Sequence, residues 1–245
     1  MRRPRILVTC WRRPLPTYLG ERTVLDTLDP AYAARVSDAG GLPLLVSRPS
    51  ADALDELLGL ADGLLLTGGG DVDPAAYGAR PENVADDVDG KADAFELALI
   101  AAARQHALPT LAICRGAQLL AVEHGGRLAQ RLPEVDGHSE LAGLAPEAIL
   151  AARHEVRLVP GSRVQRALGD GPLAVNTIHH HEIADAGELE VTASAPGGVI
   201  EAVEPRSSWA CVGVQWHPEK MSEPEQRGLF AQLVDAARER PGVAA

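Results

Sequence analysis

The chain is predicted to be an α/β protein in which a doubly wound, mostly parallel central sheet carries helices on both faces and continues into an additional antiparallel strand region. In the first half of the 245 residues, short apolar runs alternate with amphipathic stretches, which is the pattern of parallel strands joined by crossover helices. After Gly125-Gly126, short strand-like pieces follow one another, which favours a mixed or antiparallel extension of the sheet.

The first half supplies the buried parallel strands and the helices between them. Strands are expected at residues 6–10, 42–46, 63–67 and 108–114. Helices are expected at residues 30–39, 51–60 and 93–106. Ligands of such sheets bind beyond the carboxyl ends of the strands. Two segments fall at that edge, the glycine run that begins at Gly68 and the segment at Cys114.

The second half is expected to contribute strands at residues 154–159, 173–178, 189–194, 199–203 and 211–216, and a final helix at 223–240. Residues 133–153 are poorly patterned at first and rich in Ala and Leu later, which fits a surface insertion or a lid. Residues 241–245 are expected to fray. The whole chain, residues 1–245, is interpreted as one enzyme domain, long enough to bury a core without a metal or disulfides.

The composition argues against several partners and compartments. The formal net charge of −11 disfavours nonspecific attraction to nucleic acid or anionic membranes, and the aromatic fraction of 3% disfavours a stacking surface for bases. Three cysteines without close pairing fit free thiols in a reducing cytosol. Of these, Cys10 and Cys211 are interpreted as small core hydrophobes. Because no apolar stretch approaches the roughly 20 residues of a membrane span, we expect a cytoplasmic protein.

Cys114 lies where an apolar strand pattern stops and a helical pattern begins at once. This is the sequence form of a nucleophile elbow, a sharp strand-to-helix turn that exposes one side chain. The sulfur would lie at a helix N-terminus, whose partial positive charge favours the thiolate. Cys114 is therefore the candidate nucleophile.

About a hundred residues downstream, the segment from Val212 to Glu219 supplies a histidine and a carboxylate two positions apart. His217 could take the proton of the thiol, and Glu219 could accept a hydrogen bond from the other ring nitrogen and fix the tautomer. Pro218 would stiffen the link between them. We therefore expect a catalytic triad of Cys114, His217 and Glu219.

These segments resemble the class I glutamine amidotransferase superfamily, and further stretches resemble its gamma-glutamyl-gamma-aminobutyrate hydrolase (peptidase C26) branch. The further stretches are Leu66-Thr67-Gly68-Gly69-Gly70-Asp71-Val72-Asp73-Pro74 with Tyr77-Gly78, Asp93-Ala94-Phe95-Glu96, His154-Glu155-Val156, and Val175-Asn176-Thr177-Ile178-His179-His180. In order and spacing, they span nearly the whole chain. The resemblance implies the superfamily's fold and a cysteine-dependent reaction.

The resemblance also implies roles for further site residues. The backbone N–H groups of Gly69 and Arg115 would form the oxyanion hole, because glycine lets the backbone approach a tetrahedral intermediate and Arg115 directly follows the nucleophile. A phosphate-binding role for the glycine run is disfavoured, since it lacks the Gly-Lys-Ser/Thr and dinucleotide spacings. The substrate-binding residues are expected to be Gly70, Gln118, His179 and His180.

The chain departs from the family pattern at two positions. His181 stands where the family typically has glutamine, and Ala92 stands before Asp93 where the family commonly has arginine. Lys91 could supply that arginine's contact. Asp93 and Glu96 are expected to act as charges at a helix N-terminus rather than as substrate ligands.

Three consecutive histidines raise the question of a metal site, since alternate strand residues such as His179 and His181 share a face. No set of cysteines or carboxylates at ligand spacing accompanies them in the sequence. We therefore expect no metal. No organic cofactor is expected either, because backbone donors can stabilise the charge of the reaction.

The expected activity is hydrolysis of the gamma-glutamyl amide bond of a small gamma-glutamyl amine, such as gamma-glutamyl-gamma-aminobutyrate, through a thioester on Cys114. The expected partner is this small-molecule substrate, and a homodimer is left open. Two alternatives stay open as well. One is a glutaminase subunit of a two-component amidotransferase, and the other is a catalytically idle binding module.

Overall fold

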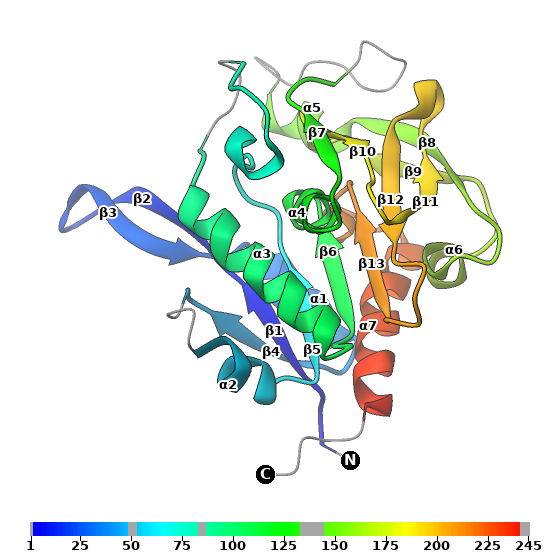
Figure 1. The fold of residues 1–245 in the computed structure, drawn as a ribbon, viewed down its shortest axis with the longest axis horizontal. Coiled ribbons are helices and arrows are strands. Elements are labelled where there is room, and N and C mark those ends of the chain that lie inside the picture. The colour runs from blue at the N-terminus through cyan, green and yellow to red at the C-terminus, as the bar shows by residue number, and fades with distance from the viewer. Residues whose placement is uncertain (1, 49–52, 83–86, 133–144, 241–245) are drawn as a thin grey trace.

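The computed structural model describes residues 2–48, 53–82, 87–132 and 145–240. In this part of the chain, eleven strands form one sheet, in the order β4-β1-β5-β6-β13-β12-β11-β8-β9, with β10 attached to β12 and β7 to β10 (Figure 1). The predicted α/β fold with an additional antiparallel region is confirmed.

Five strands form the parallel part of the sheet. They are β4 (Leu42–Val46), β1 (Arg5–Thr9), β5 (Gly63–Leu66), β6 (Thr110–Ile113) and β13 (Cys211–Val214). All residues of β5, β6 and β13 are buried, as the continuous apolar runs of sheets covered on both faces predict.

The sheet continues beyond β13 through antiparallel pairs only. The strands of this part are β12 (Ile200–Glu204), β11 (Glu190–Ser194), β8 (Arg153–Leu158), β9 (Leu173–Asn176), β10 (Glu182–Asp185) and β7 (Arg127–Ala129). The sequence predicted four of them to within two residues at each end and missed the two short strands β7 and β10.

Helices cover both faces of the parallel strands (Figure 1). The helices are α1 (Pro30–Asp38), α2 (Leu54–Gly59), α3 (Gly90–Gln105), α4 (Arg115–Glu123), α5 (Pro146–Ala151), α6 (Arg163–Leu168) and α7 (Arg227–Glu239). Short 3-10 turns lie at Pro74–Tyr77, Pro196–Gly198, Pro218–Lys220 and Pro224–Gln226. None of the helices within the described ranges has the length and apolar character needed to cross a lipid bilayer.

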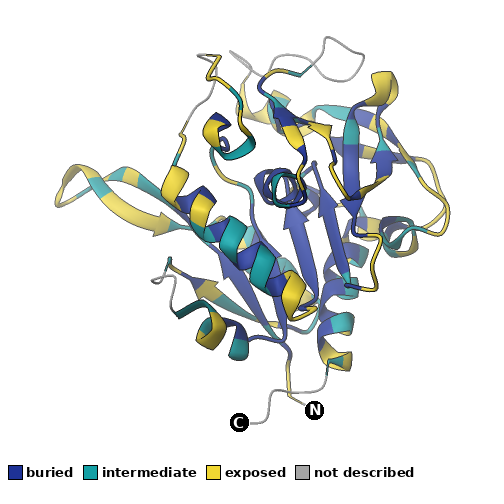
Figure 2. Ribbon diagram, viewed as in Figure 1, coloured by how far each residue is buried: buried dark blue, intermediate teal, exposed yellow. Residues whose placement is uncertain are grey.

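Successive side chains of a strand point to opposite faces of the sheet, so they pack alternately into two hydrophobic cores. Ile6 and Val8 pack in one core with Val36 of α1 and Phe230 of α7. Leu7, between them, packs in the other core with residues of α2, α3 and α4. Figure 2 shows the central strands as the most buried part of the molecule.

A two-stranded hairpin, β2 (Trp11–Thr17) and β3 (Gly20–Thr27), extends away from the body and was not predicted. Its outer half is largely exposed (Figure 2), including Tyr18 and Leu19 at the tip. The two prolines of β2 are compatible with a hairpin that pairs with no further strand among the described residues.

Three helix predictions need correction at their starts. The helix α2 begins at Leu54 instead of residue 51. The helix α3 begins at Gly90 instead of residue 93, because the Asp89 side chain accepts hydrogen bonds from the first N–H groups. The final α-helix begins at Arg227, after a 3-10 turn, instead of residue 223. Most of the predicted insertion or lid, residues 133–144, and the predicted frayed tail, 241–245, lie outside the described residues.

Candidate active site

Cys114 forms the turn between strand β6 and helix α4, as the elbow pattern predicts. Its backbone angles, φ 52° and ψ −108°, lie in a region that residues other than glycine rarely adopt. Gly116 makes the sharp turn possible, since a Cβ there would lie 2.8 Å from the carbonyl oxygen of Leu66 on the neighbouring strand. The cysteine is thus held at the N-terminus of α4 and at the carboxyl edge of the sheet.

His217 and Glu219 follow β13, the strand next to β6. The backbone N–H of Cys114 donates to the carbonyl of Val214 at 2.8 Å, which aligns the two strand ends. His217 Nδ1 lies 2.7 Å from Oε1 of Glu219, whose side chain is fully buried. The segment with Pro218 at its centre therefore brings the imidazole and the carboxylate into direct contact, as the sequence analysis expected.

The electrostatic setting of His217 favours its charged form. Burial alone would lower the pKa of this imidazole, but the neighbouring Cys114 sulfur and the Glu219 carboxylate more than offset the effect. The pKa of His217 is therefore raised well above its ordinary value. This arrangement suits a thiolate–imidazolium pair that a carboxylate stabilises.

Three residues that sequence reasoning missed hold this pair in place. Asn176, at the end of β9, makes two hydrogen bonds to the backbone of His217, donating to its carbonyl at 2.8 Å and accepting from its N–H at 2.9 Å. Tyr32 of α1 places its hydroxyl 3.3 Å from His217 Nδ1 and accepts from the N–H of Gly68 at 3.0 Å. The amide of Gln215 lies 3.7 Å from the sulfur of Cys114.

The glycine turn after β5 lies against the same imidazole. A Cβ at Gly68 would lie 2.8 Å from Cε1 of His217, and one at Gly69 would lie 2.9 Å from the Trp11 ring and 3.1 Å from Cδ of Arg115. Only glycine fits this close approach without displacing a neighbour. The predicted oxyanion-hole residues Gly69 and Arg115 are thus neighbours beside the elbow.

The guanidinium of Arg115 is buried between two carboxylates of α3. It donates to Oδ1 of Asp93 at 2.6 Å and to Glu96, and it stacks 4.5 Å above the Trp11 ring. Asp93 lies in the first turn of α3, as expected of a charge at a helix N-terminus, whereas Glu96 lies beyond it. Both carboxylates are buried, and their pairing with Arg115 was not predicted. Burial raises the pKa of each carboxyl group, and Arg115 opposes that effect. Asp93, Glu96 and Ile100 recur at helical spacing on the buried face of α3. This spacing could have predicted that the two carboxylates are buried.

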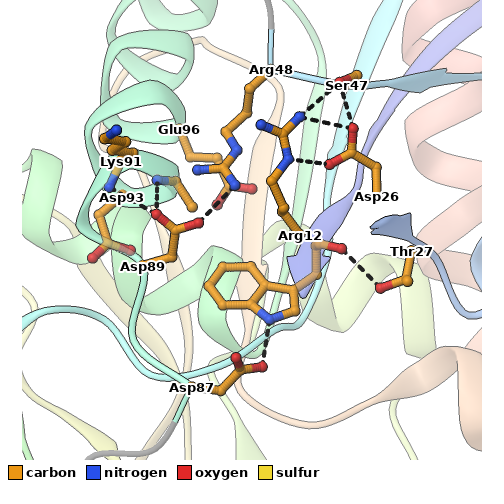
Figure 3. A network of polar contacts seen from close by, with 12 residues as sticks. Arg12, Asp26, Thr27, Ser47, Arg48, Asp87, Asp89, Lys91, Asp93 and Glu96 are labelled. Atoms are coloured by element: carbon orange, nitrogen blue, oxygen red, sulfur yellow. Dashed lines mark hydrogen bonds and ion pairs between the residues drawn. The ribbon is translucent and has the colours of Figure 1, made fainter. Parts of the chain in front are cut away.

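Further ion pairs tie the start of α3 to the base of the hairpin (Figure 3). Arg48 pairs with Asp89 at 2.7 Å, and Arg12 donates to Asp26, which also accepts from Ser47 at 2.5 Å. Arg12 holds the pKa of Asp26 down at about 2. Lys91 is exposed, and it forms no ion pair within the described residues. These contacts stabilise the base of the hairpin, where the Trp11 ring faces the site.

A cleft of about 400 Å³ opens beside the imidazole. Its lining includes Gly68, Gly69, Tyr32, His217 and Lys220. Cys114 is only 8% exposed and is not among the lining residues; its sulfur lies 4.0 Å from the carbonyl of Ile178. The cleft is large enough for a small amide substrate.

The other predicted substrate-binding residues lie around the elbow but are mostly buried. The amide of Gln118 is directed toward the carbonyl of His181 and the side chain of Gln215, at 3.5 and 3.3 Å. His179 is buried, with Nε2 3.6 Å from Glu201. His180 is half-exposed and lies 2.9 Å from Asp71, and Gly70 packs against the backbone of Asp87. Their contact with substrate stays a prediction.

Comparisons with known proteins agree with this fold. The sequence model of the family Peptidase C26 matches residues 13–219. Gamma-glutamyl-gamma-aminobutyrate hydrolase PuuD of Escherichia coli strain K12 is 35% identical over 202 residues, which cover 79% of each chain. Protein NtpR of Enterococcus hirae is 35% identical over 203 residues, which cover 81% of this chain and 84% of the relative.

One relative is longer than the matched region. A protein of Mycobacterium tuberculosis, named provisionally as a glutamine amidotransferase, is 38% identical over 209 residues, which cover 84% of this chain and 66% of the relative. Among solved structures, a Thermoplasma acidophilum protein described provisionally as one component of GMP synthase superposes with a TM-score of 0.65. The match covers 97% of this chain and 96% of that one at 17% identity, so it bears on the fold alone.

Proposed function

Because the chain belongs to the Peptidase C26 family, we propose that it is a cysteine-dependent hydrolase that cleaves the gamma-glutamyl amide bond of a small gamma-glutamyl amine. The observation that carries the proposal is the elbow cysteine, held at a positive φ angle beside the His217–Glu219 pair. Relatives named gamma-glutamyl-gamma-aminobutyrate hydrolase support the substrate class.

In the first half of the reaction, the Cys114 thiolate attacks the carbon of the gamma-amide. The carbonyl oxygen becomes an oxyanion, for which the N–H groups of Gly69 and Arg115 are the proposed donors. His217, as the imidazolium, donates its proton to the departing amine nitrogen. The C–N bond then breaks, leaving a gamma-glutamyl thioester on Cys114 and a free amine.

In the second half, the neutral imidazole of His217 takes a proton from water, and the hydroxide attacks the thioester carbon. Collapse of the second tetrahedral intermediate releases glutamate and restores the thiolate. Glu219 holds the imidazole through the 2.7 Å contact to Nδ1, so that Nε2 is the nitrogen that exchanges protons. We propose one such catalytic domain over residues 1–245.

A second candidate is a glutaminase subunit that passes ammonia to a separate synthase. It is favoured by the relative named provisionally as a glutamine amidotransferase. Such a subunit would prefer glutamine over substituted amides. An idle binding module is disfavoured, since it has no use for a strained cysteine paired with a charged imidazole.

The test is release of glutamate by the purified protein from a panel of gamma-glutamyl amines, with glutamine included. We expect release from substituted amines to exceed release from glutamine, and Cys114→Ala to abolish both. Cys211→Ala is the matched control, because this fully buried cysteine lies outside the site. Activity restricted to glutamine would favour the glutaminase subunit, and activity that survives Cys114→Ala would refute the mechanism.

A further inference from the structure

A cluster of three side chains beside the elbow takes no proton and forms no bond in the proposed hydrolysis, although His180 is also a predicted substrate contact. Asp71 follows the glycine turn after β5, and His180 and His181 precede β10, more than a hundred residues later. The fold places one donor atom of each within 4.8 Å of the other two. Sequence spacing could not reveal the carboxylate, and for this reason the histidines were expected to bind no metal.

The distances within the cluster are close to those between ligands of a metal ion. His180 Nε2 lies 2.9 Å from one carboxylate oxygen of Asp71, and His181 Nδ1 lies 3.5 Å from the other. Ligand atoms about 2.0–2.2 Å from a tetrahedral zinc ion lie about 3.3–3.6 Å from one another. Small side-chain movements would therefore suffice to bring all three onto one ion.

The buried His181 imidazole is the strongest evidence for an ion at this cluster. Its side chain is 1% exposed, and within the residues that the structure describes neither ring nitrogen has a hydrogen-bond partner. An unsatisfied buried polar group is costly and calls for an explanation.

We propose that Asp71, His180 and His181 bind one divalent ion of the zinc class, with water completing the coordination. Two imidazoles and one carboxylate select zinc, cobalt, nickel or iron over calcium and magnesium, which prefer oxygen ligands only. His180, whose side chain is 52% exposed, provides the route of entry from solvent. This inference stands apart from the proposed hydrolysis, in which the ion takes no part.

The position of the site gives the ion a structural consequence. Asp71 lies on the turn that carries Gly69, whereas His180 and His181 lie on the loop whose Ile178 carbonyl is 4.0 Å from the Cys114 sulfur. A bound ion would join these two segments. It would stabilise the folded protein according to its affinity and concentration.

The test is titration of the metal-free full chain with Co²⁺, followed by visible absorption, in the Cys114→Ala background so that the reactive thiol cannot bind the ion. We expect one Co²⁺ per chain, displaced by Zn²⁺. Asp71→Asn and His181→Gln should each weaken binding by at least about tenfold, the minimum loss typical of even outer-shell substitutions. His106→Gln, at a half-exposed histidine that pairs with Asp55, is the matched control and should bind as before.

Thermal unfolding with and without Zn²⁺ provides a second readout, and the midpoint should rise only when all three ligands are present. If Asp71→Asn or His181→Gln does not fold, His180→Gln decides the question, because its exposed ring can be removed without disturbing the core. Absence of Co²⁺ uptake by the Cys114→Ala protein, or equal uptake by this protein with and without His180→Gln, would overturn the proposal. Neither result depends on turnover, so the hydrolase proposal is tested separately.

Discussion

Cys114 combines the reacting sulfur with a strained backbone. Its φ of 52° and ψ of −108° suit glycine better than any residue with a Cβ. We expect Cys114→Gly to unfold at a higher urea concentration than Cys114→Ala, by about 1 kcal/mol in the free energy of unfolding, while both lack activity. Equal stability of the two variants would mean that the elbow is not strained.

The charge on His217 should set the alkaline limit of activity. Because the pKa of His217 is raised in the folded protein, the imidazolium persists to a higher pH than in an ordinary histidine. The stability that it contributes is complete below the ordinary histidine value and is lost as pH rises through the raised one.

Glu219→Gln removes a charge that raises the pKa of His217, so the fall of kcat/KM with pH should begin at a lower pH than in the wild-type protein. The measurement is the pH profile of glutamate release from neutral to alkaline pH for both proteins. Glu223→Gln, at a carboxylate on the same segment whose side chain is 38% exposed, is the control. An unshifted profile in Glu219→Gln would exclude the carboxylate from control of the imidazole.

Strand β9 acts on the site through one amide, because Asn176 pairs with both the N–H and the carbonyl of His217. Asn176→Ala should lower kcat by up to about a hundredfold through misplacement of the imidazole, with a smaller effect on KM. It should also cost about 1–3 kcal/mol of stability, since it leaves buried backbone groups unpaired. Steady-state kinetics with urea unfolding will measure both effects, and an unchanged kcat would show that the loop holds its position without Asn176.

Helices α3 and α4 are joined through one buried cation. Arg115→Met would leave Asp93 and Glu96 buried without their partner and should cost about 3–5 kcal/mol in the free energy of unfolding. Arg238→Met, on α7, is the control, because both side chains of the Arg238–Asp235 pair are at least 45% exposed and such a pair should contribute at most about 1 kcal/mol. Similar losses in the two variants, measured by urea unfolding, would contradict the distinction between buried and exposed pairs.

The elements differ in how far the sequence predicts them. Buried strands such as β5 and β6 are continuous apolar runs, so their place and parallel pairing could be predicted. The hairpin of β2 and β3 could not be predicted, because two prolines and several charged residues obscure the strand pattern. The hairpin pairs with no further strand among the described residues. The short strand β10 pairs through few residues, and tertiary contacts rather than local preference define it.

Across the whole molecule, the parallel order of the sheet explains why the candidate catalytic residues could be predicted from the sequence. Cys114 and His217 follow neighbouring strands, β6 and β13, whose carboxyl ends meet at one edge. The supporting groups could not be predicted. Tyr32 lies in no quoted motif, and although Asp71 and Asn176 belong to stretches that resemble the family pattern, nothing in those stretches shows which atoms they contact. Chain topology alone brings them to the same edge.

The formation of a covalent intermediate tests the proposed mechanism most directly. The wild-type protein, mixed with a gamma-glutamyl amine and quenched in acid during turnover, would be analysed by intact-mass and peptide mass spectrometry. We expect the mass of one gamma-glutamyl group to be added to the peptide that contains Cys114, and no addition in Cys114→Ala. Glutamate release without any adduct on Cys114, or an adduct on another residue, would contradict the assignment of Cys114 as the nucleophile.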